Sequence, residues 1–169
     1  QKGSAGRMIH TAYIGLGSNL NSPYTQVNAA INALQALPNT QLVSHSPWYQ
    51  SKAIGPEQPD YINGVAKLAT SLAPIELLDA LQAIEQAHHR VRKEHWGPRT
   101  LDLDILLWGD ITIKTDRLLV PHPYLEERNF VLLPLNDIAP ELILSNQKTI
   151  AELVHCCDKT GISLYLPNE

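Results

Sequence analysis

The sequence predicts an α+β fold in which helices pack on an antiparallel sheet. Short apolar runs rich in β-branched residues alternate with two segments of helical periodicity. Their order along the chain is β-α-β-β-α-β, which is the ferredoxin-like pattern: an α/β sandwich with both helices on one face of the sheet. We expect the segments after this core to be helical additions near the C-terminus.

The first strand is expected at residues 9–15, a short apolar run that ends at a glycine. We interpret Gly15 and Gly17 as a tight turn after this strand. A dinucleotide fingerprint needs a third glycine where Leu20 stands, and a phosphate-binding loop needs a Gly-Lys-Ser/Thr run that does not occur in the chain. The glycine pair alone is therefore weak support for nucleotide binding.

The other core elements follow from periodicity and turn residues. Ser22, as a capping hydroxyl, and Pro23, at the first helical position, predict the start of the first helix. Pro74 opens a second, longer helix with an apolar stripe. The remaining strands are expected at residues 40–49, 61–70 (with Gly64 as a candidate bulge) and 101–108.

Three features mark the C-terminal additions. Residues 120–123 contain two prolines and predict a stiff corner. Residues 129–138 have helical periodicity that is interrupted by Pro134. Thr149 and Glu152 have the spacing of a capping box and predict a short final helix.

Length and composition indicate one globular domain. The chain has 169 residues, of which 44% are apolar and 18% charged. Residues 1–7 are interpreted as an expression-tag remnant, which leaves residues 8–169 as the domain. Without Lys2 and Arg7, eleven basic side chains face seventeen acidic ones, and the formal net charge changes from −4 to −6. We expect no nucleic-acid partner, and an anionic ligand would need a local basic cluster.

Location and redox state follow from what the sequence lacks. No apolar run approaches membrane-spanning length and no secretory signal is present, so we expect a cytoplasmic protein without a membrane partner. The two cysteines, Cys156 and Cys157, are adjacent, an arrangement that disulfide geometry disfavours. Reduced thiols are therefore expected, and no zinc-type spacing occurs.

Asp102 and Asp104 carry the clearest chemical signal. Alternate residues of a strand share a face, so both carboxylates should project to one side and the intervening leucine to the other. Two adjacent like charges imply a compensating cation, and hard oxygen ligands suit magnesium that bridges to phosphates. The alternative is a solvated polar face on an edge strand.

A basic loop at residues 88–100 leads into this strand. Arg90, Arg92 and Arg99 can each bind phosphate oxygens through two hydrogen bonds, as a metal–polyphosphate complex requires. The alternative is a solvated loop whose charges serve solubility. The loop also holds three histidines, which lack the regular spacing of zinc ligands.

Other candidate residues lie on the second helix and among the aromatic residues. Gln82 and Glu85 fall on or beside its apolar stripe, where they either need a partner or extend to water. A further set can line a pocket for a flat heterocycle, with aromatic faces to stack and an amide to read donors and acceptors. Its members, which are otherwise plain core residues, are Tyr61, Asn63, Trp96 and Phe130.

The run Trp-Gly-Pro-Arg-Thr-Leu-Asp-Leu-Asp-Ile at residues 96–105, preceded by Arg90 and Arg92, closely resembles the 6-hydroxymethyl-7,8-dihydropterin pyrophosphokinases. The resemblance covers essentially all of the chain from Met8 onward. It includes the motifs at residues 13–20, 58–63, 121–123 and 128–135.

The resemblance implies an activity and its ligands. Members of the family transfer pyrophosphate from ATP to the hydroxymethyl group of the dihydropterin, giving AMP and the pterin diphosphate for folate biosynthesis. It also implies a ferredoxin-like fold, dependence on two Mg²⁺ ions, and ATP and the pterin as small-molecule partners. We expect the protein to act as a monomer.

The resemblance also implies roles for individual residues. Asp102 and Asp104 match the metal ligands, and Arg90 and Arg99 match arginines that assist the transfer. The residues that match ATP contacts are Gln82, Glu85, Arg92, Trp96, Arg99, Ile105, Arg117, His122 and Arg128. The residues that match pterin contacts are Ser51, Ile54, Tyr61, Asn63, Trp96 and Phe130. The chain departs from other members at Lys52, Ala53, His95, Leu119 and Pro123.

Two further hypotheses stay open. One fold hosts many functions, so the chain could be a nucleotide-sensing ferredoxin-like module without catalysis. Two metals at a carboxylate pair are also found in phosphohydrolases, which would act on ATP without a pterin.

Overall fold

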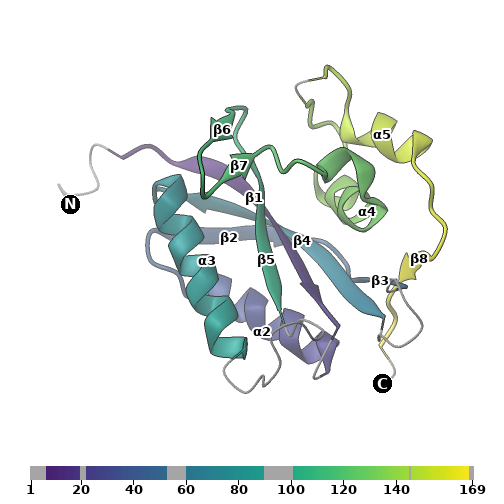
Figure 1. Ribbon diagram of the computed structural model, residues 1–169, viewed down its shortest axis with the longest axis horizontal. Helices are drawn as coiled ribbons and strands as arrows, with labels where there is room; N and C mark the ends of the chain where they lie inside the picture. The colour runs from purple at the N-terminus through teal and green to yellow at the C-terminus, as the bar shows by residue number, and fades with distance from the viewer. Residues whose placement is uncertain (1–6, 20–21, 53–59, 90–100, 145, 168–169) are drawn as a thin grey trace.

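The computed structural model describes residues 7–19, 22–52, 60–89, 101–144 and 146–167, and six of their strands form the central sheet (Figure 1). The strands of this sheet are β1 (His10–Ser18), β2 (Thr40–His45), β3 (Tyr49–Ser51), β4 (Tyr61–Thr70), β5 (Asp102–Trp108) and β8 (Ile162–Leu164). A separate hairpin is formed by β6 (Ile113–Lys114) and β7 (Leu119–Val120). The helices are α2 (Pro23–Gln35), α3 (Pro74–His89), α4 (Asn129–Ile138) and α5 (Ile150–Cys156), with a 3₁₀ turn η1 (Leu125–Glu127).

The predicted ferredoxin-like core is confirmed. The strands follow the order β5-β1-β4-β3-β8, β2 pairs with β4 beside β3, and every pairing in the sheet is antiparallel. In Figure 1, α2 and α3 lie on one side of the sheet and α4 and α5 on the other. The buried side chains accordingly form two clusters, one under each pair of helices. None of the described helices is both long and apolar enough to cross a bilayer.

The apolar faces of the helices are buried against the sheet. Leu34 of α2, Leu81 of α3 and Ile14 of β1 are fully buried together in the first cluster. On the opposite face, Leu132 and Leu135 of α4 are buried in the second cluster. Burying each such side chain contributes roughly 1.5–3 kcal/mol relative to leaving it exposed. The sheet is thus fixed from both faces, which makes it a rigid base for a site.

The interpretation of Gly15 and Gly17 as a tight turn is wrong. Strand β1 continues through both glycines to Ser18 and keeps its pairing with β4 and β5 on either side. Local preference favours a turn at two closely spaced glycines, but pairing on both edges of the strand outweighs it.

Gly64 is not a bulge, as its register with Leu16 across β1 and β4 is uninterrupted. A Cβ atom at position 64 would lie 2.5 Å from ring carbons of Trp48, so a buried indole occupies the space beside this glycine. The β2–β4 pairing is irregular instead between Leu42 and Ser44. The expected strand at residues 40–49 is also divided into β2 and β3, since Pro47 has no backbone donor for the ladder.

The two predicted helix caps differ in outcome. Ser22 has a φ of 61° and its side chain makes no capping hydrogen bond, so that prediction is wrong, although α2 does begin at Pro23. The capping box of Thr149 and Glu152 is confirmed, with bonds of 2.8 and 3.1 Å. Helix α3 begins at Pro74 as predicted and ends at His89, inside the expected loop.

Gly64→Ala is expected to destabilise the protein by about 1–3 kcal/mol, because the Trp48 ring must move to admit the new methyl group. Gly15→Ala is the matched control, since the atoms nearest to its Cβ belong to the Leu106 side chain and lie at 3.4–3.6 Å, an ordinary van der Waals distance. Urea unfolding at equilibrium measures both. Equal midpoints for the two variants would contradict the packing described here.

Candidate active site

Two cavities meet on the face of β5 that carries Asp102 and Asp104. The first, of about 640 Å³, lies between the sheet and the start of α4. The second, of about 430 Å³, lies between α3, β5 and the β6–β7 hairpin. Asp102, Asp104 and His122 line both cavities, so these side chains form the wall that the cavities share.

The predicted alternation along β5 is confirmed. Leu103 and Ile105 are buried in the cluster under α2 and α3. Asp102 is half-buried and Asp104 exposed, and both line the cavities. The pairing of β1 with β5 places a glycine opposite each acid, Gly17 beside Asp102 and Gly15 beside Asp104. The acids therefore stand next to a strip of sheet without side chains, which leaves room for a ligand.

The donor set fits magnesium. Within the described residues, no three His, Cys, Asp or Glu side chains come together as metal ligands. A structural zinc site needs about four protein ligands and a catalytic one about three, so the acid pair does not suit zinc. Magnesium usually takes one or two carboxylates and completes its shell with water and phosphate oxygens. Asp102 and Asp104, with a cavity on each side, match that requirement.

The first cavity brings together the predicted pterin residues that the structure describes. Ser51 and Tyr61 come from β3 and β4, Asn63 from β4 and Phe130 from the first turn of α4. The Ser51 hydroxyl donates a hydrogen bond of 3.2 Å to Oδ1 of Asn63, and both residues are buried. The Asn63 amide, held by Ser51, therefore lines one side of this cavity, and Tyr61 and Phe130 add aromatic side chains.

Arg128 lines the first cavity and not the second. Its guanidinium carbon lies 5.6 Å from the centroid of the Phe130 ring and 5.0 Å from that of Tyr124, within cation–π range. The aromatic side chains thus hold a positive charge in the cavity that the acids also line.

The second cavity contains the other predicted ATP residues that the structure describes, namely Gln82, Glu85, Ile105, Arg117 and His122. Arg117 spans it from the hairpin to α3, where Nη2 donates to Oδ1 of Asp79 at 2.7 Å and to Oε1 of Gln82 at 3.0 Å. Oε2 of Glu85 accepts the backbone N–H of Leu103 at 2.7 Å. Glu85 thus attaches α3 to the strand that carries the acids.

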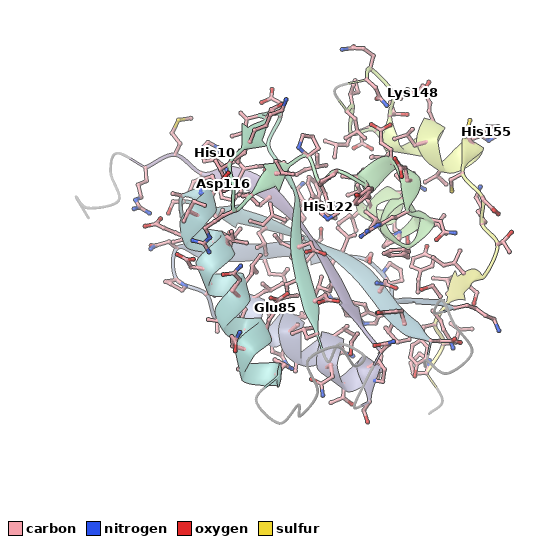
Figure 2. All side chains as sticks on the ribbon, in the orientation of Figure 1. His10, Glu85, Asp116, His122, Lys148 and His155 are labelled. Carbon is pink, nitrogen blue, oxygen red and sulfur yellow. The ribbon has the colours of Figure 1, made fainter. Side chains whose placement is uncertain are left out.

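His122 stands where the cavities join. In Figure 2, His122 and Glu85, which belongs to α3, lie beside the β5 ribbon. The His122 backbone N–H donates to Leu106, and its Nδ1 accepts the N–H of Tyr124 at 3.2 Å. Burial lowers the pKa of His122; the Asp104 carboxylate opposes this shift and Arg128 adds to it. The neutral ring, with its proton on Nε2, is therefore favoured at pH 7, and it can donate a hydrogen bond without carrying a charge.

Some cavity residues were not predicted. Lys52, Thr160 and Gly161 line the first cavity because the Lys52 N–H donates to Gly161 where β8 pairs with β3. Asp79 accepts a hydrogen bond from Arg117, which lines the second cavity. No local pattern signals these contacts, since each joins residues far apart in the chain. Leu119 and Pro123, noted as departures, do line the second cavity.

Five predicted site residues lie outside the described residues: Ile54, Arg90, Arg92, Trp96 and Arg99. His95 and Ala53, two of the noted departures, lie outside them as well. Their roles stay predictions.

The chain is similar in sequence to known proteins. The sequence profile of the 7,8-dihydro-6-hydroxymethylpterin-pyrophosphokinase (HPPK) family matches residues 13–140. The 2-amino-4-hydroxy-6-hydroxymethyldihydropteridine pyrophosphokinase of Haemophilus influenzae is 54% identical over 145 residues, which cover 85% of this chain and 91% of that protein. The Pseudomonas aeruginosa protein of the same name is 52% identical over 156 residues, 92% of this chain and 96% of that one.

The fold is shared with a solved structure. The Plasmodium falciparum HPPK-DHPS crystal structure with pterin and p-hydroxybenzoate superposes with a TM-score of 0.71 at 16% identity. The match covers 90% of this chain and 44% of that one, so this chain corresponds to less than half of the Plasmodium protein. At this identity the likeness shows the fold alone. With the profile match and the two close relatives, the chain belongs to the 7,8-dihydro-6-hydroxymethylpterin-pyrophosphokinase family.

Proposed function

We propose that this protein transfers the two terminal phosphates of ATP, as one pyrophosphoryl group, to the hydroxymethyl group of 6-hydroxymethyl-7,8-dihydropterin. The products are AMP and the pterin diphosphate, an intermediate of folate biosynthesis. The observation that carries the proposal is the acid pair shared by two cavities, because a transfer between two substrates needs both to meet at one charged point. Membership of the pyrophosphokinase family supports it.

The first cavity suits the pterin. Tyr61 and Phe130 offer aromatic faces for a flat ring, and the Asn63 amide offers a donor and an acceptor to its edge. A cavity of about 640 Å³ is in the range of small-molecule sites, roughly 300–1,000 Å³. The ring would lie with its hydroxymethyl arm toward Asp102 and Asp104.

The second cavity suits the nucleotide. Arg117 and neutral His122 present donors to phosphate or ribose oxygens, and Ile105 lies at its β5 wall. The cavity borders the first at the acids, so the phosphate tail would point toward the pterin. Arg90 and Arg99, from the basic run before β5, are proposed to close over the transferring group.

Asp102 and Asp104 would hold the two magnesium ions, which neutralise phosphate charge and lower the pKa of the attacking hydroxyl. The side chains around them hold the two substrates in line. The hydroxymethyl group gives up its proton to water as its oxygen forms a bond to the β-phosphorus, the bond from that phosphorus to the α-phosphate bridging oxygen breaks, and AMP leaves with that oxygen. The protein forms no covalent bond to either substrate and acts by positioning and charge.

Two expectations extend beyond the chemistry. We propose that the protein acts as a monomer, and that it works in the cytoplasm. Neither bears on the reaction.

AMP release separates this proposal from its alternatives. With MgATP alone the protein is expected to release almost no AMP, and addition of 6-hydroxymethyl-7,8-dihydropterin should start release with one pterin diphosphate formed per AMP. Chromatography of the nucleotides and pterins measures both. A phosphohydrolase would consume ATP without the pterin, and a nucleotide sensor would release no AMP in either case.

Asp102→Asn and Asp104→Asn should each lower kcat by at least about 100-fold, because each removes a negative ligand for magnesium at the point of transfer. Asp102 is half-buried, Asp104 is exposed and both line the cavities, so the unfolding midpoint should change little. Asp110→Asn, an exposed acid that lines neither cavity, is the control and should retain activity. Near-normal turnover in either acid variant would contradict the proposed metal site.

A further inference from the structure

Asn63, Gly17 and Asp102 form one row across three strands. Gly17 of β1 pairs with Asn63 of β4 on one edge and with Asp102 of β5 on the other, and all three line the first cavity. Neighbouring strands lie about 4.8 Å apart, so the backbones of Asn63 and Asp102 are separated by roughly 10 Å. Between the Asn63 amide and the Asp102 carboxylate, the floor of the cavity is thus Gly17, which has no side chain.

The Asn63 side chain occupies part of that space. A Cβ atom at position 17 would lie 2.7 Å from Nδ2 of Asn63 and 3.8 Å from its Cγ, so the amide nitrogen lies directly over Gly17. The other end of the amide is held by the Ser51 hydroxyl, which donates to Oδ1 at 3.2 Å. Asn63 is 8% exposed. Its amide is therefore confined between Ser51 and Gly17.

Backbone conformation does not explain the glycine. In the described residues, the glycines with positive φ are Gly109 and Gly161, and Gly17 lies in regular paired strand. An alanine at this position would meet no backbone strain. At Gly15, two residues earlier on the same face, the atoms nearest to the missing Cβ belong to the Leu106 side chain, at 3.4 Å or more. What distinguishes Gly17 is the amide of Asn63.

We propose that Gly17 is a positioning residue for Asn63: the missing side chain at position 17 lets the Asn63 amide lie across β1, and this placement sets the affinity for the pterin. The inference rests on the proposed function, since it takes the ligand of the first cavity to be the pterin. A methyl group at position 17 would push the amide out of line with the ring edge. The nucleotide cavity, which neither residue lines, would be unaffected.

A double-mutant cycle tests this inference. The wild type, Gly17→Ala, Asn63→Ala and the double variant are compared by the Kd for 6-hydroxymethylpterin, in the presence of Mg²⁺ and α,β-methylene-ATP. Gly17→Ala is expected to weaken pterin binding about tenfold, the cost of one or more misplaced buried hydrogen bonds. In the Asn63→Ala background the same substitution should change the Kd by less than about twofold, because the amide it displaces is absent. The Kd for α,β-methylene-ATP without pterin should be equal in all four proteins.

Gly15→Ala provides the matched cycle. Its methyl is added to the same face of the same strand, and whatever it does to pterin binding should be the same with and without the Asn63 amide. A Gly17→Ala effect that persists in the Asn63→Ala background would overturn the inference, since the methyl would then act on the ligand directly. A Gly17→Ala protein that does not fold would also overturn the inference. The new methyl group meets only the end of the Asn63 side chain, which can rotate away, so the substitution should change pterin binding and not folding.

The outcomes separate this inference from the proposed function. If the wild type binds no pterin, the proposed function fails and the inference fails with it. If the wild type binds the pterin and the Gly17–Asn63 cycle shows no coupling, the positioning role alone is overturned.

Discussion

The site depends on the pairing of β1 with a strand on each side. This pairing sets Gly15 and Gly17 opposite Asp104 and Asp102, and it sets Gly17 opposite Asn63. A shift of one residue in the β1–β5 register would turn the acids into the apolar core and the leucines into the cavities, and the same shift in the β1–β4 register would turn Asn63 to the other face. The register is held because both faces of the sheet are buried, one under α2 and α3 and the other under α4 and α5. The geometry of the charged site is thus fixed by apolar packing.

The two cavities are joined through the acids and supported by different parts of the chain. The β-α-β-β-α-β core supplies the acids, the glycines and the α3 wall, where Glu85 bonds the Leu103 backbone. The additions after β5 supply the hairpin, His122 and α4. A common fold therefore gains two adjoining cavities, which we propose as the two substrate sites, because its C-terminal additions complete their walls.

Much of this arrangement was predictable from the sequence where the signal is local. The alternation that projects Asp102 and Asp104 to one side, the start of α3 at Pro74 and the bounds of α4 all follow from periodicity and turn residues. The roles of Arg117 and His122 came only from family resemblance, since one exposed arginine and one histidine carry no pattern.

The wrong predictions at the glycines have a tertiary cause, because contacts with distant parts of the chain outweigh local preference. Gly15 and Gly17 favour a turn locally, yet β4 and β5 hold them in a strand. Gly64 suggests a bulge locally, yet it makes room for Trp48. The contribution of Thr160 and Gly161 depends on β8 reaching β3, which no nearby residue indicates.

The most direct measurement of the central claim is a crystal structure with α,β-methylene-ATP, Mg²⁺ and 6-hydroxymethylpterin. The account predicts metal ions at Asp102 and Asp104, between the triphosphate in the second cavity and the pterin ring in the first. A triphosphate that binds elsewhere, or acids that hold no metal ion, would contradict it.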